Sequence, residues 1–156
     1  MKTADVIIVG SGAAGLFNAL FLPQDYKVIV ITKKEVEESD SFLAQGGISA
    51  LKNPEDYDSY FEDTMKAGHY ENDKGAVEKM IKESPQIIQD LKDFGVRFDL
   101  KDGEIEFTRE GGHSTFRILH HEDLTGKEIT SHLYEEAKKR DNITIMEDCM
   151  MIDIIE

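Results

Sequence analysis

The chain has 156 residues, of which 40% are hydrophobic and 32% charged, so it is long and apolar enough to form one globular domain with its own core. The net charge of -14 argues against a nucleic-acid partner, because phosphate binding needs a basic surface. The single cysteine excludes an internal disulfide and a cysteine-based zinc site, and no apolar run is long enough for a signal peptide or a membrane span, so we expect a cytoplasmic protein without a membrane partner.

Residues 5–32 predict a strand, a helix and a second strand. The run DVIIVG (5–10) is apolar and β-branched throughout, which is typical of a strand buried on both faces in a parallel sheet. Small residues and helix formers follow up to Pro23, and KVIVIT (27–32) predicts a second buried strand. Two such strands around one helix within about thirty residues form a βαβ unit.

The middle of the chain predicts helices followed by a hairpin. Residues 54–68 carry apolar side chains at helical spacing and end at a capping glycine, Gly68. The apolar pattern of residues 76–95 is interrupted at Ser84 and Pro85, where serine as N-cap and proline at the first helical position predict two consecutive helices. Residues 96–100 and 104–108 flank an Asp-Gly pair, which predicts a β-hairpin.

The C-terminal part predicts one more helix and two short strands. Thr125 and Glu128 have the spacing of a capping box, and the helix that they start ends in the cationic run KKRDN. Residues 143–156 predict a strand, a break and a second strand that runs almost to the last residue. A strand at that position favours an incomplete domain, and we expect this chain to be the N-terminal part of a longer polypeptide. Cys149, in this apolar run, is expected to be a partly buried and unreactive thiol.

The strongest motif is a glycine-rich turn, Gly10-Ser11-Gly12-Ala13-Ala14-Gly15, which directly follows the first strand and opens the first helix. In this context Gly10 permits the tight turn, Gly12 lets a pyrophosphate approach the backbone, and Gly15 lets the helix pack against the strand. The helix N-terminus adds free N–H groups and a partial positive charge, so an acidic protein can bind an anionic cofactor there. The acid that usually ends the second strand and binds a ribose is missing, and Thr32, Lys33 or the backbone must replace it.

From here the motifs resemble a known family. The runs GSGAAGL, DSFLAQGGISA, FEDTMKAG, FGVRFD and TREGGHSTFRILHHEDLTGKEI occur in the order found in the L-aspartate oxidases, a branch of the succinate dehydrogenase and fumarate reductase flavoprotein superfamily. The resemblance covers essentially the whole chain, and the run from Thr108 is its most specific part. It implies an α/β, Rossmann-like FAD-binding domain with a parallel sheet. The N-terminal portion of that domain spans residues 1–156, is incomplete at its C-terminus and contains an inserted helical and hairpin segment. The capping and C-terminal helical domains are absent.

The resemblance also implies the cofactor contacts. The pyrophosphate of FAD would meet Ser11, Gly12, Ala13 and Ala14, and the adenosine side would meet Lys33 and the backbone of Met150 and Met151. The flavin would be wrapped by Asp40, Ser41, Phe42, Leu43, Ala44, Gln45, Gly46 and Gly47. Without the resemblance, AQGG favours a simple tight turn and the two methionines favour core filling. Relatives with covalent FAD carry a histidine where this chain has Asp40, so we expect non-covalent FAD.

Glu110 is either a solvated loop acid or, by the resemblance, a buried carboxylate that meets the α-ammonium of the substrate. Such a carboxylate selects an amino acid over succinate, because it would be left unpaired by succinate. His113 follows in the site wall, although a structural role is favoured for any single histidine of this stretch. His120 and His121 are expected to be scaffold or surface residues, with no metal site because no third ligand falls at useful spacing. Arg109 and Arg117 fit either substrate carboxylates or structural ion pairs.

The predicted reaction is oxidation of L-aspartate to iminoaspartate, with FAD as hydride acceptor and O2 or fumarate as reoxidant, as the first step of NAD biosynthesis through quinolinate. The family's acid/base arginine and its other carboxylate-binding residues lie beyond residue 156, so we expect the chain alone to be inactive. Two alternatives stay open, namely a fumarate reductase or succinate dehydrogenase flavoprotein and a non-catalytic FAD-binding fragment. The sequence leaves open whether quinolinate synthase is a partner.

Overall fold

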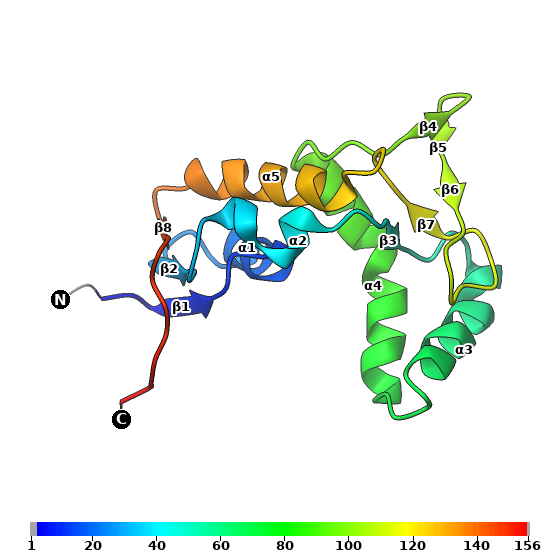
Figure 1. Ribbon diagram of the computed structural model, residues 1–156, viewed down its shortest axis with the longest axis horizontal. Coiled ribbons are helices and arrows are strands. Elements are labelled where there is room, and N and C mark those ends of the chain that lie inside the picture. Colours follow the sequence, from blue (N-terminus) through cyan, green and yellow to red (C-terminus); the bar gives the residue numbers. More distant parts are fainter. Residues whose placement is uncertain (1–2, 156) are drawn as a thin grey trace. The chain divides into compact units, whose positions relative to one another are not determined.

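The structure is a computed structural model that describes residues 3–155, and it consists of two compact units. The first, here called the sheet unit, joins the segment up to Gln45 with the segment from Gly126 onward (Figure 1). The second, here called the inserted unit, spans Gly46–Thr125. The inserted helical and hairpin segment predicted from the sequence is therefore confirmed as a unit of its own. No helix among residues 3–155 combines the length and the apolarity needed to cross a membrane.

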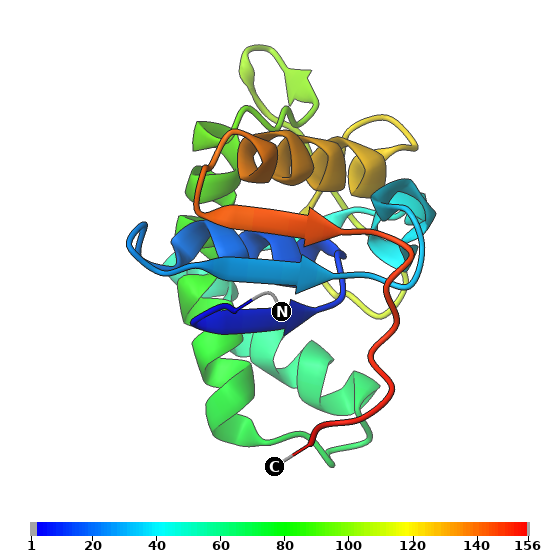
Figure 2. The same ribbon diagram turned by 90° about the vertical axis from the view of Figure 1, so that its left-hand side faces the viewer.

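The sheet unit is built on three parallel strands, β1 (Val6–Val9), β2 (Val28–Ile31) and β8 (Ile143–Met146). Their order is β1-β2-β8, and the register pairs Val6 with Val28 and Val28 with Ile143 (Figure 2). Helix α1 (Ala13–Phe21) connects the first two strands, and Leu22 is its C-cap residue, directly before Pro23. The predicted βαβ unit and the parallel sheet are confirmed.

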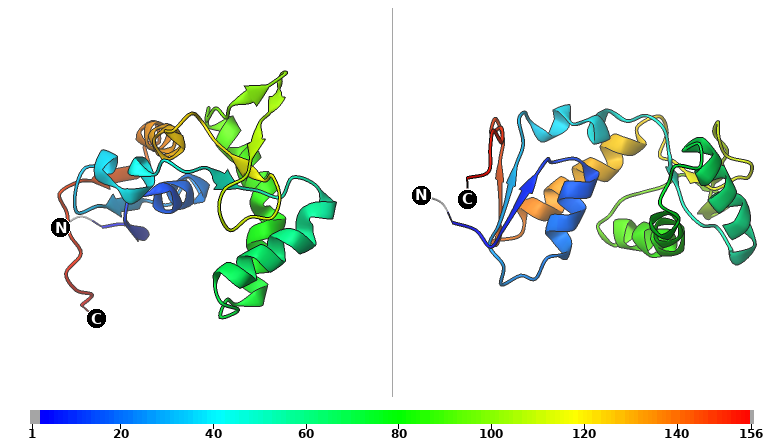
Figure 3. Two further views of the ribbon diagram at one scale, coloured as in Figure 1. Left: turned by 45° about the vertical axis from the view of Figure 1, so that its right-hand side comes forward. Right: turned by 90° about the horizontal axis from the view of Figure 1, so that it is seen from below.

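Helices α1 and α5 (Thr125–Lys138) both lie on one face of this sheet (Figures 2 and 3). The core between α1 and the strands contains the buried Ala19, Val28 and Val30. Ile7 and Val9 point away from that core and are 62% and 55% exposed. The prediction that the first strand is buried on both faces is therefore wrong for the described chain, because alternate side chains of a strand face opposite sides and only one side carries helices.

The C-terminal predictions are partly confirmed. Helix α5 buries Ile129, Leu133 and Ala137, the residues predicted from their spacing. Thr125 is the first helical residue rather than a residue before the helix, and its Oγ1 accepts a hydrogen bond from the His121 backbone N–H at 3.0 Å. The predicted strand after β8 is wrong, because residues 149–155 form no strand. An apolar β-branched run becomes a strand only where a neighbouring strand supplies hydrogen bonds, and here Ile152 remains 88% exposed.

The inserted unit contains two helices and two small antiparallel sheets. Helix α3 (Tyr57–Ala67), preceded by η2 (Pro54–Asp56), packs on α4 (Lys74–Asp93) through the buried Tyr60, Met65, Val77 and Ile81. One sheet joins β3 (Ile48–Ser49), β7 (Ile118–Leu119) and β6 (Phe107–Thr108) in that order. The other is the hairpin of β4 (Leu100–Lys101) and β5 (Glu104–Ile105). The hairpin is confirmed, and Asp102 and Gly103 both have positive φ, as its two-residue turn requires.

Helix α4 runs without a break through Pro85, so the prediction of two consecutive helices is wrong. A proline inside a helix removes the hydrogen bond to the carbonyl four residues earlier, which here belongs to Ile81. The Ser84 hydroxyl donates to that same carbonyl at 2.7 Å and accepts a hydrogen bond from the Leu51 backbone N–H at 2.8 Å. The serine thus replaces the bond that the proline cannot make, and the helix continues.

Candidate functional site

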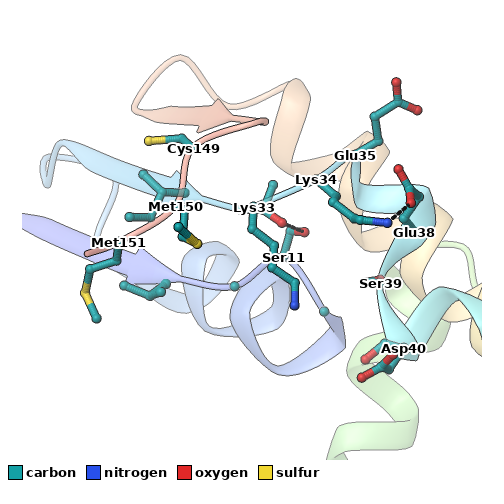
Figure 4. A pocket seen from close by; sticks show the side chains of 16 residues that line it. Ser11, Lys33, Lys34, Glu35, Glu38, Ser39, Asp40, Cys149, Met150 and Met151 are labelled. Carbon is teal, nitrogen blue, oxygen red and sulfur yellow. Dashed lines mark hydrogen bonds and ion pairs between the residues drawn. The ribbon is translucent and has the colours of Figure 1, made fainter. Parts of the chain in front are cut away.

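A cavity of about 580 Å³ lies at the carboxyl ends of β1 and β2 in the sheet unit. The carboxyl edge of a parallel α/β sheet is where such folds bind ligands. Figure 4 shows the cavity with its lining side chains. The predicted cofactor residues that line it are Gly10, Ser11, Gly12, Lys33, Asp40, Ser41, Met150 and Met151.

The three glycines of the turn have distinct geometric roles. Gly10 has φ of 109°, a conformation that residues with a side chain rarely adopt. A Cβ on Gly12 would lie 2.8 Å from the Ser41 hydroxyl, and a Cβ on Gly15 would lie 2.1 Å from the Gly10 carbonyl oxygen. Gly15 therefore permits the helix to pack on the turn, and Gly12 keeps the backbone open at the cavity.

The N-terminus of α1 is free to bind an anion. The preceding residue, Gly12, offers no side-chain cap, and the first turn, which contains Ala13 and Ala14, carries no acidic residue. The backbone N–H groups of that turn have no partner within the helix, and the helix dipole places partial positive charge there. Together with the open backbone at Gly12, these groups fit a pyrophosphate.

A buried hydrogen bond ties the glycine turn to the end of β2. The Ser11 hydroxyl donates to Thr32 Oγ1 at 2.9 Å, and the Cys149 backbone N–H donates to the Thr32 carbonyl at 2.9 Å. Thr32 thus stands where related folds carry a ribose-binding acid, and the next residue, Lys33, extends its side chain toward the loop that carries Ser11 (Figure 4). Within residues 3–155 Lys33 forms no ion pair, whereas Lys34 is paired with Glu38 at 2.5 Å.

Several cavity residues were not predicted from the sequence. Glu38, Ser39 and Cys149 line the cavity, and Cys149 is half-buried, as expected of that thiol. Their position follows from the topology, because the segment after each parallel strand starts at the same edge of the sheet. That signal was available for residues 147–151, which directly follow a predicted strand.

The remaining predicted cofactor residues lie outside the cavity lining. Ala13, Ala14 and Gly15 are part of α1, and Phe42 and Leu43 belong to the short helix α2 (Asp40–Leu43), which Ser39 caps through its hydroxyl. Gly126 was not predicted, yet its N–H donates to the Ala44 carbonyl at 3.0 Å and a Cβ on it would lie 2.2 Å from the Ser41 carbonyl oxygen. A glycine at the start of α5 thus allows that helix to approach the segment around Ala44. Gln45 ends the sheet unit's first segment.

Gly46, Gly47 and Glu110 come together in the inserted unit. The Gly47 backbone N–H donates to Glu110 Oε1 at 3.0 Å, and the Glu110 carboxylate lies directly beside Gly46. Glu110 is exposed, so the prediction of a buried carboxylate is wrong for the described chain. It is nevertheless not a freely solvated loop acid, because a backbone donor that lies far away in the sequence holds its carboxylate in place.

Arg117 is the most buried charge in the described part of the chain, with an exposed fraction of 0%. Its Nη2 lies 2.8 Å from Asp56 and its Nη1 lies 2.6 Å from Asp63, so the structural ion pair is the correct alternative for this residue. The hydrogen bonds from Arg117 hold the pKa of Asp56 well below its usual range. Burial opposes ionisation of Asp63, but hydrogen bonds from Ser114 and Arg117 outweigh it and lower that pKa too.

The other predicted residues of this region have separate surroundings. His113 is half-buried, with its Nδ1 3.1 Å from Arg117 Nη1. His120 and His121 both face Asp99, at 3.1 and 3.4 Å, which fits the predicted scaffold role. Arg109 is exposed and lies over the Phe116 ring. Within residues 3–155 there is no group of three His, Cys, Asp or Glu side chains that could hold a metal ion.

Comparison of the sequence with known proteins also indicates FAD binding. Residues 5–156 match the family described as FAD binding domain. The L-aspartate oxidase of Clostridium perfringens is 46% identical over 153 residues, which cover 98% of this chain and 35% of that protein. The chain thus spans about a third of the length of this curated relative.

Solved structures are similar in fold. Quinol fumarate reductase FrdA of E. coli superimposes with a TM-score of 0.86 at 25% identity, over 93% of this chain and 26% of that one. Mycobacterium smegmatis Sdh1 has a TM-score of 0.82 at 29% identity, over 94% of this chain and 28% of that one. Since the matched family, the glycine turn and the free helix N-terminus agree, this chain belongs to the FAD binding domain family, and FAD is its cofactor.

Proposed function

We propose that this chain is the N-terminal part of an L-aspartate oxidase, in which the complete protein oxidises L-aspartate to iminoaspartate. The observation that carries the proposal is the 46% identity to the Clostridium perfringens L-aspartate oxidase along 98% of the chain. The identity to fumarate reductase FrdA is 25%, although the fold is the same. The aspartate oxidase branch is therefore favoured over the dicarboxylate branch.

The sheet unit holds the cofactor in this proposal. The first turn of α1 and the open backbone at Gly12 bind the pyrophosphate, and Lys33 with the segment of Met150 and Met151 binds the adenosine side. The segment from Asp40 through Gly47 lies along the flavin without a covalent bond, since Asp40 has no nucleophilic ring nitrogen. When bound, FAD supplies the hydride acceptor, and O2 or fumarate reoxidises it.

Glu110 selects the substrate in this proposal. Its carboxylate is held by the Gly47 N–H at 3.0 Å, so its position does not depend on the substrate. An ionised carboxylate only accepts hydrogen bonds, which suits the α-ammonium group of L-aspartate. Succinate offers no ammonium, so its binding would leave the carboxylate without that partner once water is expelled.

The place of the reaction in metabolism is part of the same proposal. Iminoaspartate would feed NAD biosynthesis through quinolinate in the cytoplasm. The acid/base arginine of the family lies in the two thirds of the relatives that this chain does not cover, so the chain by itself would bind FAD and not turn over.

The direct test uses the complete protein, loaded with FAD and freed of oxygen. L-aspartate or succinate is added and the visible flavin spectrum is recorded. Bleaching by L-aspartate alone is the expected result. Bleaching by succinate alone would move the protein to the dicarboxylate branch, and bleaching by neither would remove the oxidase proposal.

The Glu110→Gln variant of the complete protein tests the amine-binding role. Loss of a hydrogen bond to a charged group costs about 1.5–3 kcal/mol, so we expect the KM for L-aspartate to rise roughly 10- to 100-fold. Glu104→Gln, which removes another exposed acid of the inserted unit, is the matched control and should leave the KM unchanged. Equal KM values for both variants would show that Glu110 does not meet the substrate.

A further inference from the structure

Two acids, one directly before α3 and one within it, hold the segment that follows Glu110. Asp56 precedes α3 and accepts hydrogen bonds from Thr115 Oγ1 at 2.6 Å and from Arg117 Nε at 2.9 Å. Asp63, two turns further on, accepts from the Ser114 backbone N–H at 2.7 Å and from the Ser114 hydroxyl at 2.8 Å. Because Asp56 directly precedes α3 and Asp63 lies within it, these hydrogen bonds fix the segment from residue 113 to residue 117 relative to α3.

The guanidinium of Arg117 has all of its donors satisfied. An arginine offers five N–H groups and no acceptor. Nε and Nη2 donate to Asp56, Nη1 donates to Asp63, and the second N–H of Nη2 donates to Ser59 Oγ at 2.8 Å. The fifth donor is the second N–H of Nη1, and it reaches His113 Nδ1 at 3.1 Å. A buried donor without a partner is costly, so the histidine completes the buried arginine site.

This contact determines where the proton of His113 sits. Because Arg117 can only donate, Nδ1 of His113 must accept, and a neutral imidazole then carries its proton on Nε2. The Tyr60 ring meets the His113 ring edge-on, with centroids 6.2 Å apart, and it also lies 4.8 Å from Arg117 Cζ. The ring of His113 is thus held from two sides, and its Nε2–H has a defined direction.

His113 also belongs to the same turn as Glu110. The His113 backbone N–H donates to the Glu110 carbonyl at 3.3 Å, and Gly112 between them has φ of 84°. The turn therefore carries one anchored acceptor, the Glu110 carboxylate, and one oriented donor, the His113 Nε2–H. An α-amino acid presents the complementary pair, an ammonium group next to a carboxylate.

We propose that Arg117 is a positioning residue that holds His113 as its Nε2–H tautomer, so that His113 donates to a carboxylate of the amino-acid substrate while Glu110 meets the ammonium group. The part that concerns the substrate rests on the function proposed above. The part that concerns the tautomer stands on the contacts of the inserted unit alone, and each part has its own test.

The tautomer is measured by long-range ¹H–¹⁵N NMR of the uniformly ¹⁵N-labelled chain at about pH 8, above the ordinary histidine pKa of about 6.5. His120 is an internal reference of opposite kind, because its Nδ1 faces the acceptor Asp99 at 3.1 Å and must carry the proton. The expected spectrum has the proton on Nε2 of His113 and on Nδ1 of His120. A proton on Nδ1 of His113, or a mixture of both forms, would overturn the positioning role of Arg117.

The Arg117→Lys variant tests whether Arg117 is what fixes the tautomer of His113. A lysine cannot donate to both aspartates and to His113 in the same geometry, so the fixed tautomer should be replaced by a mixture. Arg109→Lys, the same substitution at an exposed arginine of the neighbouring segment, should leave the His113 signal unchanged. A His113 signal that is identical in Arg117→Lys would contradict the proposal. If Arg117→Lys does not fold, the proposal is decided by the tautomer of His113 in the unaltered chain.

The substrate contact is tested in the complete, FAD-loaded protein with two variants of His113. Glutamine can accept from Arg117 through Oε1 and donate through Nε2, so His113→Gln should keep the KM for L-aspartate within about threefold. Leucine removes both functions, so His113→Leu should raise the KM roughly 10- to 100-fold with a much smaller change in kcat. A purely structural histidine would instead lower kcat and stability without a selective effect on KM.

The two proposals fail in different ways. If the complete protein does not oxidise L-aspartate, the proposed function fails, while the NMR result still decides the tautomer. If it oxidises L-aspartate and His113→Leu leaves the KM unchanged, the substrate contact of His113 fails and the proposed function stands.

Discussion

Single glycines decide how close the backbone of this chain can come to itself and, in the proposed cofactor site, to FAD. Gly15 lies inside α1, where glycine normally costs about 1 kcal/mol relative to alanine. It is tolerated there because a Cβ would lie 2.1 Å from the Gly10 carbonyl oxygen, which is backbone and cannot rotate away. Gly12 differs, because its neighbour at 2.8 Å is the hydroxyl of Ser41, a side chain that can turn aside.

Alanine variants of these two glycines should therefore behave differently. We expect Gly15→Ala to lower the free energy of unfolding by about 3 kcal/mol or more, because the clash forces helix and turn apart. Gly12→Ala should cost less than about 1 kcal/mol, because the Ser41 hydroxyl can turn aside, and should weaken FAD binding at least about tenfold, because the methyl group would occupy the space proposed for the pyrophosphate. Urea unfolding and an FAD titration by flavin fluorescence measure the two effects. Equal stability of both variants would contradict the assignment.

Arg117 illustrates what residue patterns leave undecided. The sequence offered a substrate carboxylate or a structural ion pair as its partner, and nothing local separates the two. Its acceptors Asp56 and Asp63 are more than fifty positions away in the chain, so only the packing of the inserted unit shows that the charge is already satisfied.

Helix α4 shows how one side chain can keep a helix intact across a proline. Ser84 followed by Pro85 predicted a new helix start, because serine and proline favour those positions. The tertiary structure instead buries Ser84 and brings the Leu51 backbone N–H to its hydroxyl. Ser84 thereby links Leu51, which follows β3, to helix α4. Its hydroxyl also donates to the Ile81 carbonyl, the hydrogen bond that Pro85 cannot make.

Alanine substitutions at Ser84 and Pro85 should change the free energy of unfolding in opposite directions. Ser84→Ala leaves the Leu51 N–H and the Ile81 carbonyl without their partner, so we expect a loss of about 1–3 kcal/mol in the free energy of unfolding. Pro85→Ala restores a backbone N–H for the Ile81 carbonyl. An interior proline costs a helix about 3 kcal/mol, whereas the loss of its stiffening of the unfolded chain costs only about 0.4–1 kcal/mol. Pro85→Ala should therefore be stabilising in chemical denaturation, and a destabilised Pro85→Ala would refute this account.

The chain as a whole carries 32 acidic and 18 basic residues, so its response to acid depends on which carboxylates are bound. The pKa values of Asp56 and Asp63 are lowered in the folded protein, which means that they bind protons more readily when the chain unfolds. Their contribution to stability is therefore present above the ordinary aspartate pKa of about 3.9 and is lost as the pH falls through the lowered values.

We accordingly expect the free energy of unfolding to fall steeply below about pH 4. Asp56→Asn should be less stable near neutral pH, because it weakens the pairing of a buried arginine, and should show a flatter decrease in acid. Asp58→Asn removes the same charge from an exposed position of α3 and should keep the steep decrease. Urea titrations at a series of pH values measure both. If the free energy of unfolding of Asp56→Asn falls with decreasing pH as steeply as that of the parent chain, the stabilising role of the Asp56–Arg117 ion pair is contradicted.

Local patterns were sufficient for the features that depend on near neighbours in the chain. These are the βαβ unit, the glycine turn at the start of α1, the end of that helix before Pro23 and the Asp-Gly hairpin, since each is determined by backbone conformation and side-chain periodicity within a few residues. Long-range contacts decided the rest. The continuity of α4, the anchoring of Glu110 by Gly47 and the pairing of Arg117 all depend on partners tens of residues away, and packing sets the positions of those partners. One face of β1 is exposed for the converse reason, because α1 and α5 both pack on the other face of the sheet, which the local pattern of the strand does not show.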